Sequence, residues 1–503
     1  MKPWVKRTVG AVCVILVAAV VTAGWYLSNT LPVGTGHVAK TICSNVFIAK
    51  RNPEAVFRED IAPVHFLFAI TKFDVNKTEK SVASTSYGFF ETKAIFREGC
   101  GCTVVKGTAE EELRRQTFMN VPPEPSNEER KTDLLWPTGD RVPRVPLPDG
   151  VDGHKLNQAL AAAFSEPAPD NPRKTRAVIV VYDGKLVAER YAPGFSKSIP
   201  LLGWSMSKSV TNALVGVLVR KGKLDIHRPA PVPEWQNADD PRRRITLDQL
   251  LRMSSGLEFG ETYAPFSDAV SMFYDSYDFA AYAAQKPLEE EPDTKFHYSS
   301  GTANIIARIV RRAAEEEYRH YYAFIHRELF DKIGMHSVVF EPDPSGTFVG
   351  SSYVFATARD WARFGLLYLQ DGVWEGERLL PEGWVSYTTT PTQKAPLGEY
   401  GALFWLNAGS ASNPANRRWP SIPKDAYLAD GFQEQRVIII PSRKLVLVRL
   451  GNCSYSDAWN DEKFISKVLA ALPKPELSSL RSQPVESLPS RASESNDKVV
   501  RLE

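Results

Sequence analysis

Two β-hairpins far apart in the chain limit its possible folds more than any other feature. The first joins Ala177–Tyr182 to Leu186–Tyr191 through an Asp-Gly pair, a dipeptide typical of two-residue β-turns. The second joins Arg436–Ile440 to Leu445–Leu450 through a short polar turn. Mainly helical patterns separate the hairpins, and an amphipathic run over residues 457–472 follows them. This order predicts an α+β fold with an antiparallel sheet flanked by helices, plus a helical lobe.

The composition excludes several classes of protein. The chain has 503 residues, and its 61 Lys and Arg against 59 Asp and Glu leave a net charge of +2. That balance gives no basic surface field for a polyanion, so no nucleic-acid partner is predicted. The five cysteines and eight histidines lack the paired spacing of metal ligands. We therefore expect neither a metal nor another cofactor.

The N-terminus carries a membrane-spanning signal. Thr8–Leu27 is a stretch of 20 residues without charge, and Lys2, Lys6 and Arg7 precede it. A helix of that length spans about 30 Å, the thickness of a bilayer's hydrocarbon core. Because basic flanks stay cytoplasmic, residues 1–7 are predicted inside and the rest outside. The predicted location is the bacterial inner membrane, with a single pass and the main domain in the periplasm.

A cleavable signal peptide is the alternative, because Val21-Thr22-Ala23 offers small residues before a cut and would release a secreted or periplasmic protein. An uncleaved anchor is favoured, because Trp25 and Tyr26 suit the far interface of a membrane. Export also permits a disulfide between Cys43 and either Cys100 or Cys102, and the sequence does not choose between these partners.

The rest of the chain divides by composition. Residues 28–150 are predicted to be an exported accessory region, with strands over about 60–105 that include the apolar segment Val64–Ile70, ending in a Pro-rich connector from 121. Residues 151–472 form the main domain. Residues 473–503, rich in Ser, Pro and charge, are predicted to be a disordered tail.

Within the main domain, Ser205 and Lys208 carry the clearest chemistry. Apolar periodicity after Gly203 predicts a helix that begins at Ser205, so Lys208 at i+3 shares its face. A serine needs a neighbouring base to act as a nucleophile, and a desolvated lysine near a helix N-terminus can serve. The alternative is an N-cap serine beside a surface lysine. The same spacing recurs at Ser421–Lys424 and Ser495–Lys498, where no helix is predicted.

Three further segments follow in a fixed order: residues 246–257 (TLDQLLRMSSGL), 296–301 (FHYSSG) and 429–431 (ADG). With Ser205-x-x-Lys208, this order resembles the serine β-lactamase-related and penicillin-recognising family. The likeness covers about residues 150–472. It is strongest to the branch of 6-aminohexanoate-dimer hydrolases and esterases beside class C β-lactamases. The resemblance implies a β-lactamase/transpeptidase-like fold.

The resemblance also implies roles for individual residues. Ser205 would be the nucleophile that becomes acylated, and Lys208 its base or proton relay. Tyr298 would exchange protons with Ser205 and the leaving group, with the charge of Lys208 helping it to ionise near neutrality. Tyr263 occupies the position of a substrate-contacting tyrosine.

For the oxyanion hole, the resemblance implies the backbone N–H groups of Ser205 and Phe432. Gly431 would let its strand approach the substrate closely. The aromatic residues Tyr182, Trp361 and Trp405 are predicted to pack in the core.

Two departures from the family pattern restrict the substrate. The family's Tyr-x-Asn reads Tyr298-Ser299-Ser300, and Ala429-Asp430 replace a Lys or His followed by a hydroxyl residue. The group that would bind a β-lactam carboxylate is therefore absent. Asp430 would either favour a cationic substrate or be a solvated turn residue. The prediction is a serine hydrolase for a small ester or amide. The alternatives are a β-lactamase or D-aminopeptidase, and a non-catalytic module that binds peptidoglycan or peptides.

Overall fold

The computed structural model describes residues 3–64, 68, 70–116, 134–143, 145–168, 170–317, 321–453 and 456–474. Most of the predicted C-terminal tail, most of the apolar segment Val64–Ile70 and the first part of the Pro-rich connector lie outside the described residues. The third Ser-x-x-Lys spacing, at Ser495, lies outside them too.

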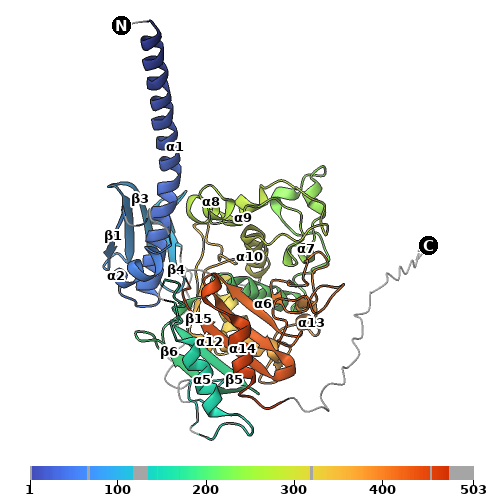
Figure 1. Ribbon diagram of the computed structural model, residues 1–503. Coiled ribbons are helices and arrows are strands. Elements are labelled where there is room, and N and C mark those ends of the chain that lie inside the picture. The colour runs from blue at the N-terminus through green and yellow to red at the C-terminus, as the bar shows by residue number, and fades with distance from the viewer. Residues whose placement is uncertain are drawn as a thin grey trace, which may run out of the picture.

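A six-stranded antiparallel sheet forms the centre of the main domain (Figure 1). Both predicted hairpins are confirmed, as β5–β6 and β14–β15, and β15 pairs with β5 so that the two ends of the domain meet. In spatial order the strands are β12 (Trp405–Leu406), β13 (Tyr427–Gly431), β14 (Gln435–Ile440), β15 (Leu445–Leu450), β5 (Ala177–Tyr182) and β6 (Lys185–Tyr191).

Helices bury both faces of this sheet. Alternate residues of β5 show the division, because Val178 and Val180 join one hydrophobic cluster while Ile179 and Val181 join the other. The smaller cluster lies under α5 (Gly153–Ala163) and α14 (Asp461–Leu469), and the larger lies under α6 (Met206–Arg220) and α12 (Ala358–Leu369). A strand buried on both faces reads as a continuous apolar run, which is the pattern of these sequences.

The predicted helical lobe lies beyond α6 and packs around α10 (Ser300–Glu315). Its other helices are α7 (Leu247–Leu251), α8 (Asp268–Asp275), α9 (Phe279–Ala284) and α11 (Tyr321–Ile325); α13 (Trp384–Thr388) lies further along the chain. Short strands complete the domain: β7 (Leu201–Leu202), β9 (Val354–Ala356) and β8 (Val339–Phe340) in one sheet, and β10 (Val373–Trp374) with β11 (Glu377–Arg378) in another.

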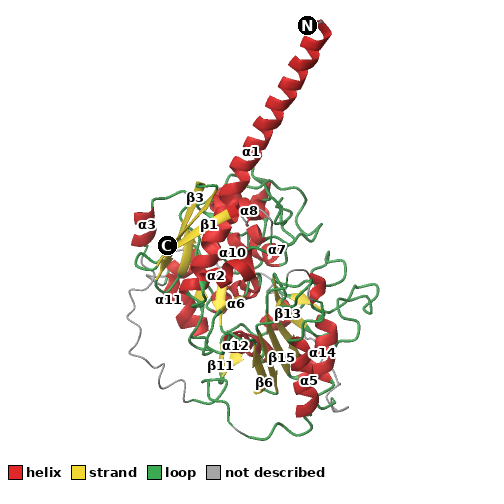
Figure 2. Cartoon of the chain, turned by 60° about the vertical axis from the view of Figure 1, so that its left-hand side comes forward, coloured by secondary structure: helices red, strands yellow, loops and turns green. Residues whose placement is uncertain are grey.

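The N-terminal helix α1 is longer than the predicted anchor and runs from Pro3 to Phe47. It is the one helix among the described residues that is long and apolar enough to cross a membrane, and its most apolar window is wholly exposed. Its second half is buried against a four-stranded antiparallel sheet (Figure 2). That sheet contains β1 (Thr71–Asn76), β2 (Ser81–Ser86), β3 (Phe89–Arg97) and β4 (Gly101–Val104), near the short helices α2 (Pro53–Val56) and α3 (Glu110–Arg115).

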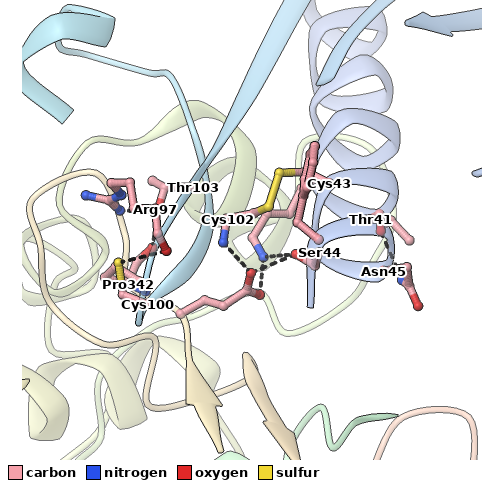
Figure 3. The surroundings of a disulfide bond; sticks show 12 residues. Thr41, Cys43, Ser44, Asn45, Arg97, Cys100, Cys102, Thr103 and Pro342 are labelled. Atoms are coloured by element: carbon pink, nitrogen blue, oxygen red, sulfur yellow. Dashed lines mark hydrogen bonds and ion pairs between the residues drawn. A yellow bond between two sulfur atoms is a disulfide. The ribbon is translucent and has the colours of Figure 1, made fainter. Parts of the chain in front are cut away.

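A disulfide and a buried ion pair join α1, the small sheet and the main domain. The disulfide links Cys43 to Cys102, which answers the choice left open by the sequence; Cys100 is a buried free thiol (Figure 3). Beside it, the fully buried carboxylate of Glu341 pairs with Lys40 and accepts hydrogen bonds from Ser44 Oγ at 2.7 Å and from Cys102 N at 2.6 Å. The small sheet and α1 are thus fixed to the main domain.

The end of the predicted connector also packs on the main domain. The indole N–H of Trp136 donates to the carbonyl of Gly184 at 3.2 Å, and the guanidinium of Arg363 donates to the carbonyls of Pro137 and Gly139. The boundary of the main domain at residue 151 stays a prediction. The backbone N–H of Asp152 donates to the carbonyl of Ala471, which joins the two ends of the segment 151–472.

Candidate active site

Ser205 lies at the N-terminus of α6, directly after a strained residue. Trp204 has a φ of 48°, in the left-handed region that costs a bulky residue roughly 1–3 kcal/mol and is most often found at functional sites. Ser205 occupies the N-cap position, yet within the described residues its hydroxyl makes no capping hydrogen bond. The alternative that the Ser205 side chain serves to cap the helix is therefore wrong, and its hydroxyl is available for another partner.

That partner is Lys208. Its ammonium nitrogen lies 3.1 Å from Ser205 Oγ, 3.0 Å from Ser300 Oγ and 3.2 Å from the carbonyl oxygen of Ser351. The side chain is buried, not on the surface as the alternative supposed. Burial lowers the pKa of Lys208 to about 8, and the carboxylate of Glu261 opposes that shift. A sizeable fraction of Lys208 is therefore neutral near pH 8 and able to accept the Ser205 proton.

Glu261 and Ser300 complete this hydrogen-bonded network. Glu261 accepts hydrogen bonds from the backbone N–H and the hydroxyl of Ser300, both at 2.6 Å, and Ser300 in turn accepts from Lys208. Ser300 stands where the family pattern has asparagine. The serine thus provides a contact to Lys208 at that position, and the carboxylate behind it holds the serine in place.

Tyr298 is close to the pair, but its protonation differs from the prediction. Lys208 Nζ lies 4.6 Å from the centroid of the Tyr298 ring. Burial, reinforced by Tyr400 and Glu261, raises the pKa of Tyr298 well above its usual value, and a hydrogen bond with Ser205 acts weakly in the other direction. The prediction that the Tyr298 hydroxyl ionises near neutrality is therefore wrong for the free protein. Tyr298 is a neutral hydroxyl, suited to donating or relaying a proton.

Gly431 brings the end of β13 against the segment before the serine. A Cβ atom at Gly431 would lie 2.1 Å from the carbonyl oxygen of Gly203, so only glycine permits this approach. The approach places Phe432 and Ser205 on the same pocket. The oxyanion-hole role of their N–H groups stays a prediction.

Asp430 is neither a free anionic site nor a solvated turn residue. It lies on β13 and pairs with Arg436 and, at 2.7 Å, with Arg418. Two guanidinium groups neutralise its carboxylate, so it offers no unpaired charge to a cationic substrate. The prediction missed these partners.

The residues meet in a pocket of about 330 Å³, large enough for a small ester or amide. The charged residues of its lining are Glu261, Asp430, Glu434, Arg418 and Arg436, and ion pairs join Asp430 to both arginines and Glu434 to Arg436. Its lining also includes Ser205, Tyr263, Tyr298, Trp405, Gly431, Phe432, Gln433 and Cys453.

Aromatic rings form much of the pocket wall. The ring of Tyr263 lies 5.5 Å from that of Phe432, and Phe432 packs edge-on to Trp204 at 5.7 Å. Trp405, predicted to be core packing, is half-buried and lies 5.4 Å from the ring of Tyr298. It is therefore a wall of the candidate site. Of the other Ser-x-x-Lys pairs, the Ser421 hydroxyl instead hydrogen-bonds Glu462.

Comparisons with known proteins agree with this architecture. The model of the Beta-lactamase family matches residues 160–471. A 6-aminohexanoate-dimer hydrolase of Paenarthrobacter ureafaciens is 26% identical over 270 residues, which cover 48% of this chain and 66% of that protein, just under two thirds of its length. Two crystal structures superpose with a TM-score of 0.50 at 15% identity. A penicillin-binding protein homologue from Caulobacter crescentus covers 65% of this chain and 99% of its own, and a family VIII carboxylesterase covers 65% and 98%.

At such low identity the two structures establish the fold alone. Together, the fold and the family match define a protein with the β-lactamase/transpeptidase-like architecture. Since the family model spans more than half of its residues, the chain belongs to the Beta-lactamase family.

Proposed function

We propose that this protein hydrolyses a small ester or amide through an acyl-enzyme on Ser205. The observation that carries the proposal is the 3.1 Å contact between Ser205 Oγ and the buried Lys208 amine, whose pKa is lowered to about 8. No other serine–lysine pair with this spacing in the described residues lies on a helix in a pocket.

The mechanism follows from the positions of these groups. Neutral Lys208 takes the hydroxyl proton as Ser205 Oγ attacks the carbonyl carbon, and the oxyanion faces the N–H groups of Ser205 and Phe432. Tyr298 passes a proton to the leaving alcohol or amine as the carbonyl bond to it breaks. Water then attacks the acyl group, gives a proton to the same network, and releases the acid with Ser205 restored.

The pairing of the pocket's charged residues supports a neutral substrate. Arg418 and Arg436 are already paired with Asp430, so neither is free to bind the carboxylate of a β-lactam. The named relatives include a 6-aminohexanoate-dimer hydrolase and a carboxylesterase, which supports ester or amide cleavage. A β-lactamase and a D-aminopeptidase are the alternatives within this chemistry.

The test is covalent labelling of the purified full-length chain with a fluorophosphonate. We expect stoichiometric labelling that Ser205→Ala abolishes and that the matched control Ser421→Ala retains. Absent labelling would favour a non-catalytic binding module, and labelling that persists in Ser205→Ala would assign the nucleophile to another residue. Turnover of short acyl esters and 6-aminohexanoate oligomers should then exceed turnover of a chromogenic cephalosporin. Faster cephalosporin turnover would establish a β-lactamase.

The pH dependence tests the role assigned to Lys208. Because its neutral form is the active one, kcat/KM on a neutral ester should rise with pH and level off above about 8. The Glu261 carboxylate raises this pKa, so Glu261→Gln should move the rising limb to lower pH. Glu258→Gln, an exposed change in the same loop, should leave the limb in place. If Glu261→Gln leaves the rising part of the pH profile unmoved, the pKa that controls it belongs to a group other than Lys208.

A further inference from the structure

Large exposed aromatic side chains gather where α1 leaves the body of the protein. Trp25 and Tyr26 of α1 are 60% and 41% exposed, and Phe266 is 47% exposed in the loop before α8. The Trp25 and Phe266 rings stack at 5.3 Å, and Tyr26 packs edge-on to Phe266 at 5.6 Å. Phe266 is 241 positions away in sequence, so the fold brings this loop to the helix.

A second segment reaches the same level from the small sheet. Tyr87 lies in the turn between β2 and β3 and is 67% exposed, and Phe89, 72% exposed, begins β3 and is followed by Phe90. Thr35 of α1 and Thr92 of β3 share a hydrogen bond at 2.8 Å, which fixes the helix and strand at one height. Further along both elements, Phe47 of α1 meets Phe96 of β3, so the two run in the same direction.

The heights follow from helix and strand geometry. Phe89 precedes Thr92 by three residues, about 10 Å along a strand. Seven residues of helix cover about the same distance, so Phe89 lies level with Ser28, about one helical turn from the height of Trp25 and Tyr26. Figures 1 and 2 show the small sheet beside the point where α1 emerges from the body. The aromatic collar is the set Trp25, Tyr26, Tyr87, Phe89, Phe90 and Phe266.

A bilayer surface is the partner that fits the aromatic collar. The collar lies where the exposed apolar part of α1 meets the body, and α1 is the one described helix that is apolar and long enough to span a membrane. The collar thus continues a surface already suited to lipid. Aromatic rings concentrate at the headgroup level of membranes, whereas an exposed apolar patch on a freely soluble protein is a liability.

We propose that the β2–β3 turn and Phe266 seat on the membrane around α1, so that the protein rests on the bilayer at three points. The loop that ends in Phe266 also carries Glu261 and Tyr263 of the pocket. Docking therefore holds one wall of the candidate site next to the headgroups. The docking itself does not depend on the hydrolase activity.

The experiment measures lipid contact at the collar in the full-length chain. Cys13 is replaced by serine, since the other thiols outside the disulfide are buried. Phe89→Cys is then labelled with a nitrobenzoxadiazole dye and reconstituted in phosphatidylcholine–phosphatidylglycerol vesicles that contain headgroup-region spin-labelled lipid. The matched control is Tyr277→Cys, another exposed aromatic position at 44%. It follows Tyr274, whose hydroxyl hydrogen-bonds His37 at 2.8 Å, eleven residues beyond Tyr26 on α1 and so deeper in the body.

We expect several-fold stronger quenching at position 89 than at 277, together with blue-shifted emission, and the same behaviour for Phe266→Cys. Equal quenching at 89 and 277 would overturn the proposal. A blue shift of the dye emission at position 89 that grows with the protein-to-lipid ratio, without quenching by the spin-labelled lipid, would also overturn the proposal. It would indicate contact between copies of the protein instead. A mature chain that begins after Ala23 and leaves the vesicles would also overturn the proposal. Ser205→Ala should dock normally, which separates this result from the test of catalysis.

Discussion

Replacing Lys208 by methionine is expected to lower kcat/KM on an activated ester by about 10³-fold, within the range that general acid–base catalysis contributes. Methionine fills a similar volume in a site where the lysine is almost fully buried. It removes the amine that lies 3.1 Å from Ser205 Oγ and 3.0 Å from Ser300 Oγ. The rate of fluorophosphonate labelling should fall in parallel, because both reactions require an activated Ser205.

Two controls separate a base from a positive charge. Lys208→Arg keeps the charge, but a guanidinium does not lose its proton in this pH range, so it should not restore activity. Lys221→Met, at the other end of the same helix, should leave kcat/KM unchanged. Recovery by arginine would show that Lys208 acts through charge alone. Retention of more than about a tenth of the activity in Lys208→Met would rule out a general base of the usual strength.

The second large effect concerns stability. Lys40→Met should lower the free energy of unfolding by about 3–5 kcal/mol, because it leaves the buried carboxylate of Glu341 without its charge partner. Burial lowers the pKa of Lys40 and the ion pair with Glu341 opposes this, so each group depends on the other. Urea unfolding of the detergent-solubilised chain, followed by tryptophan fluorescence, measures the change.

Two comparisons identify the cause. Adding Glu341→Gln to Lys40→Met should recover part of the loss, since no buried charge then remains. Lys80→Met removes a surface pair with Glu98 and should cost at most about 1 kcal/mol. If the Lys40 and Lys80 variants are equally stable, the buried pair does not hold α1 to the main domain in the manner described.

Local sequence signals predicted the parts of the structure that depend on near neighbours. The Asp-Gly turn between β5 and β6 shows positive φ at both Asp183 and Gly184, as its sequence indicates. The pairing of Ser205 with Lys208 follows from helix spacing alone. The β-lactamase/transpeptidase-like fold was also predicted, because several motifs lie in register with the hairpins.

Contacts between distant residues could not be predicted in this way. Glu261 reaches Ser300 across 39 positions, and no spacing rule links them. Asp430 was interpreted without its partner Arg418, which lies in an irregular loop. The predicted anchor ended at Leu27 with the apolar stretch, whereas α1 continues to Phe47 through Pro32, a residue that ordinarily ends a helix. Packing of the following residues against β2 and β3 outweighs that local preference.

The uninterrupted course of α1 has a consequence for how such an enzyme would meet its substrate. No flexible tether separates the apolar half of the helix from the half fixed by Cys43 and Lys40. With the apolar half in a bilayer, the protein could not swing through the surrounding solution as a domain on a random-coil linker does. Its remaining freedoms would be drift in the plane of the membrane and rotation about the membrane normal. Encounters with a substrate dissolved in the membrane would then depend on its amount per unit area, and encounters with one in solution on its bulk concentration.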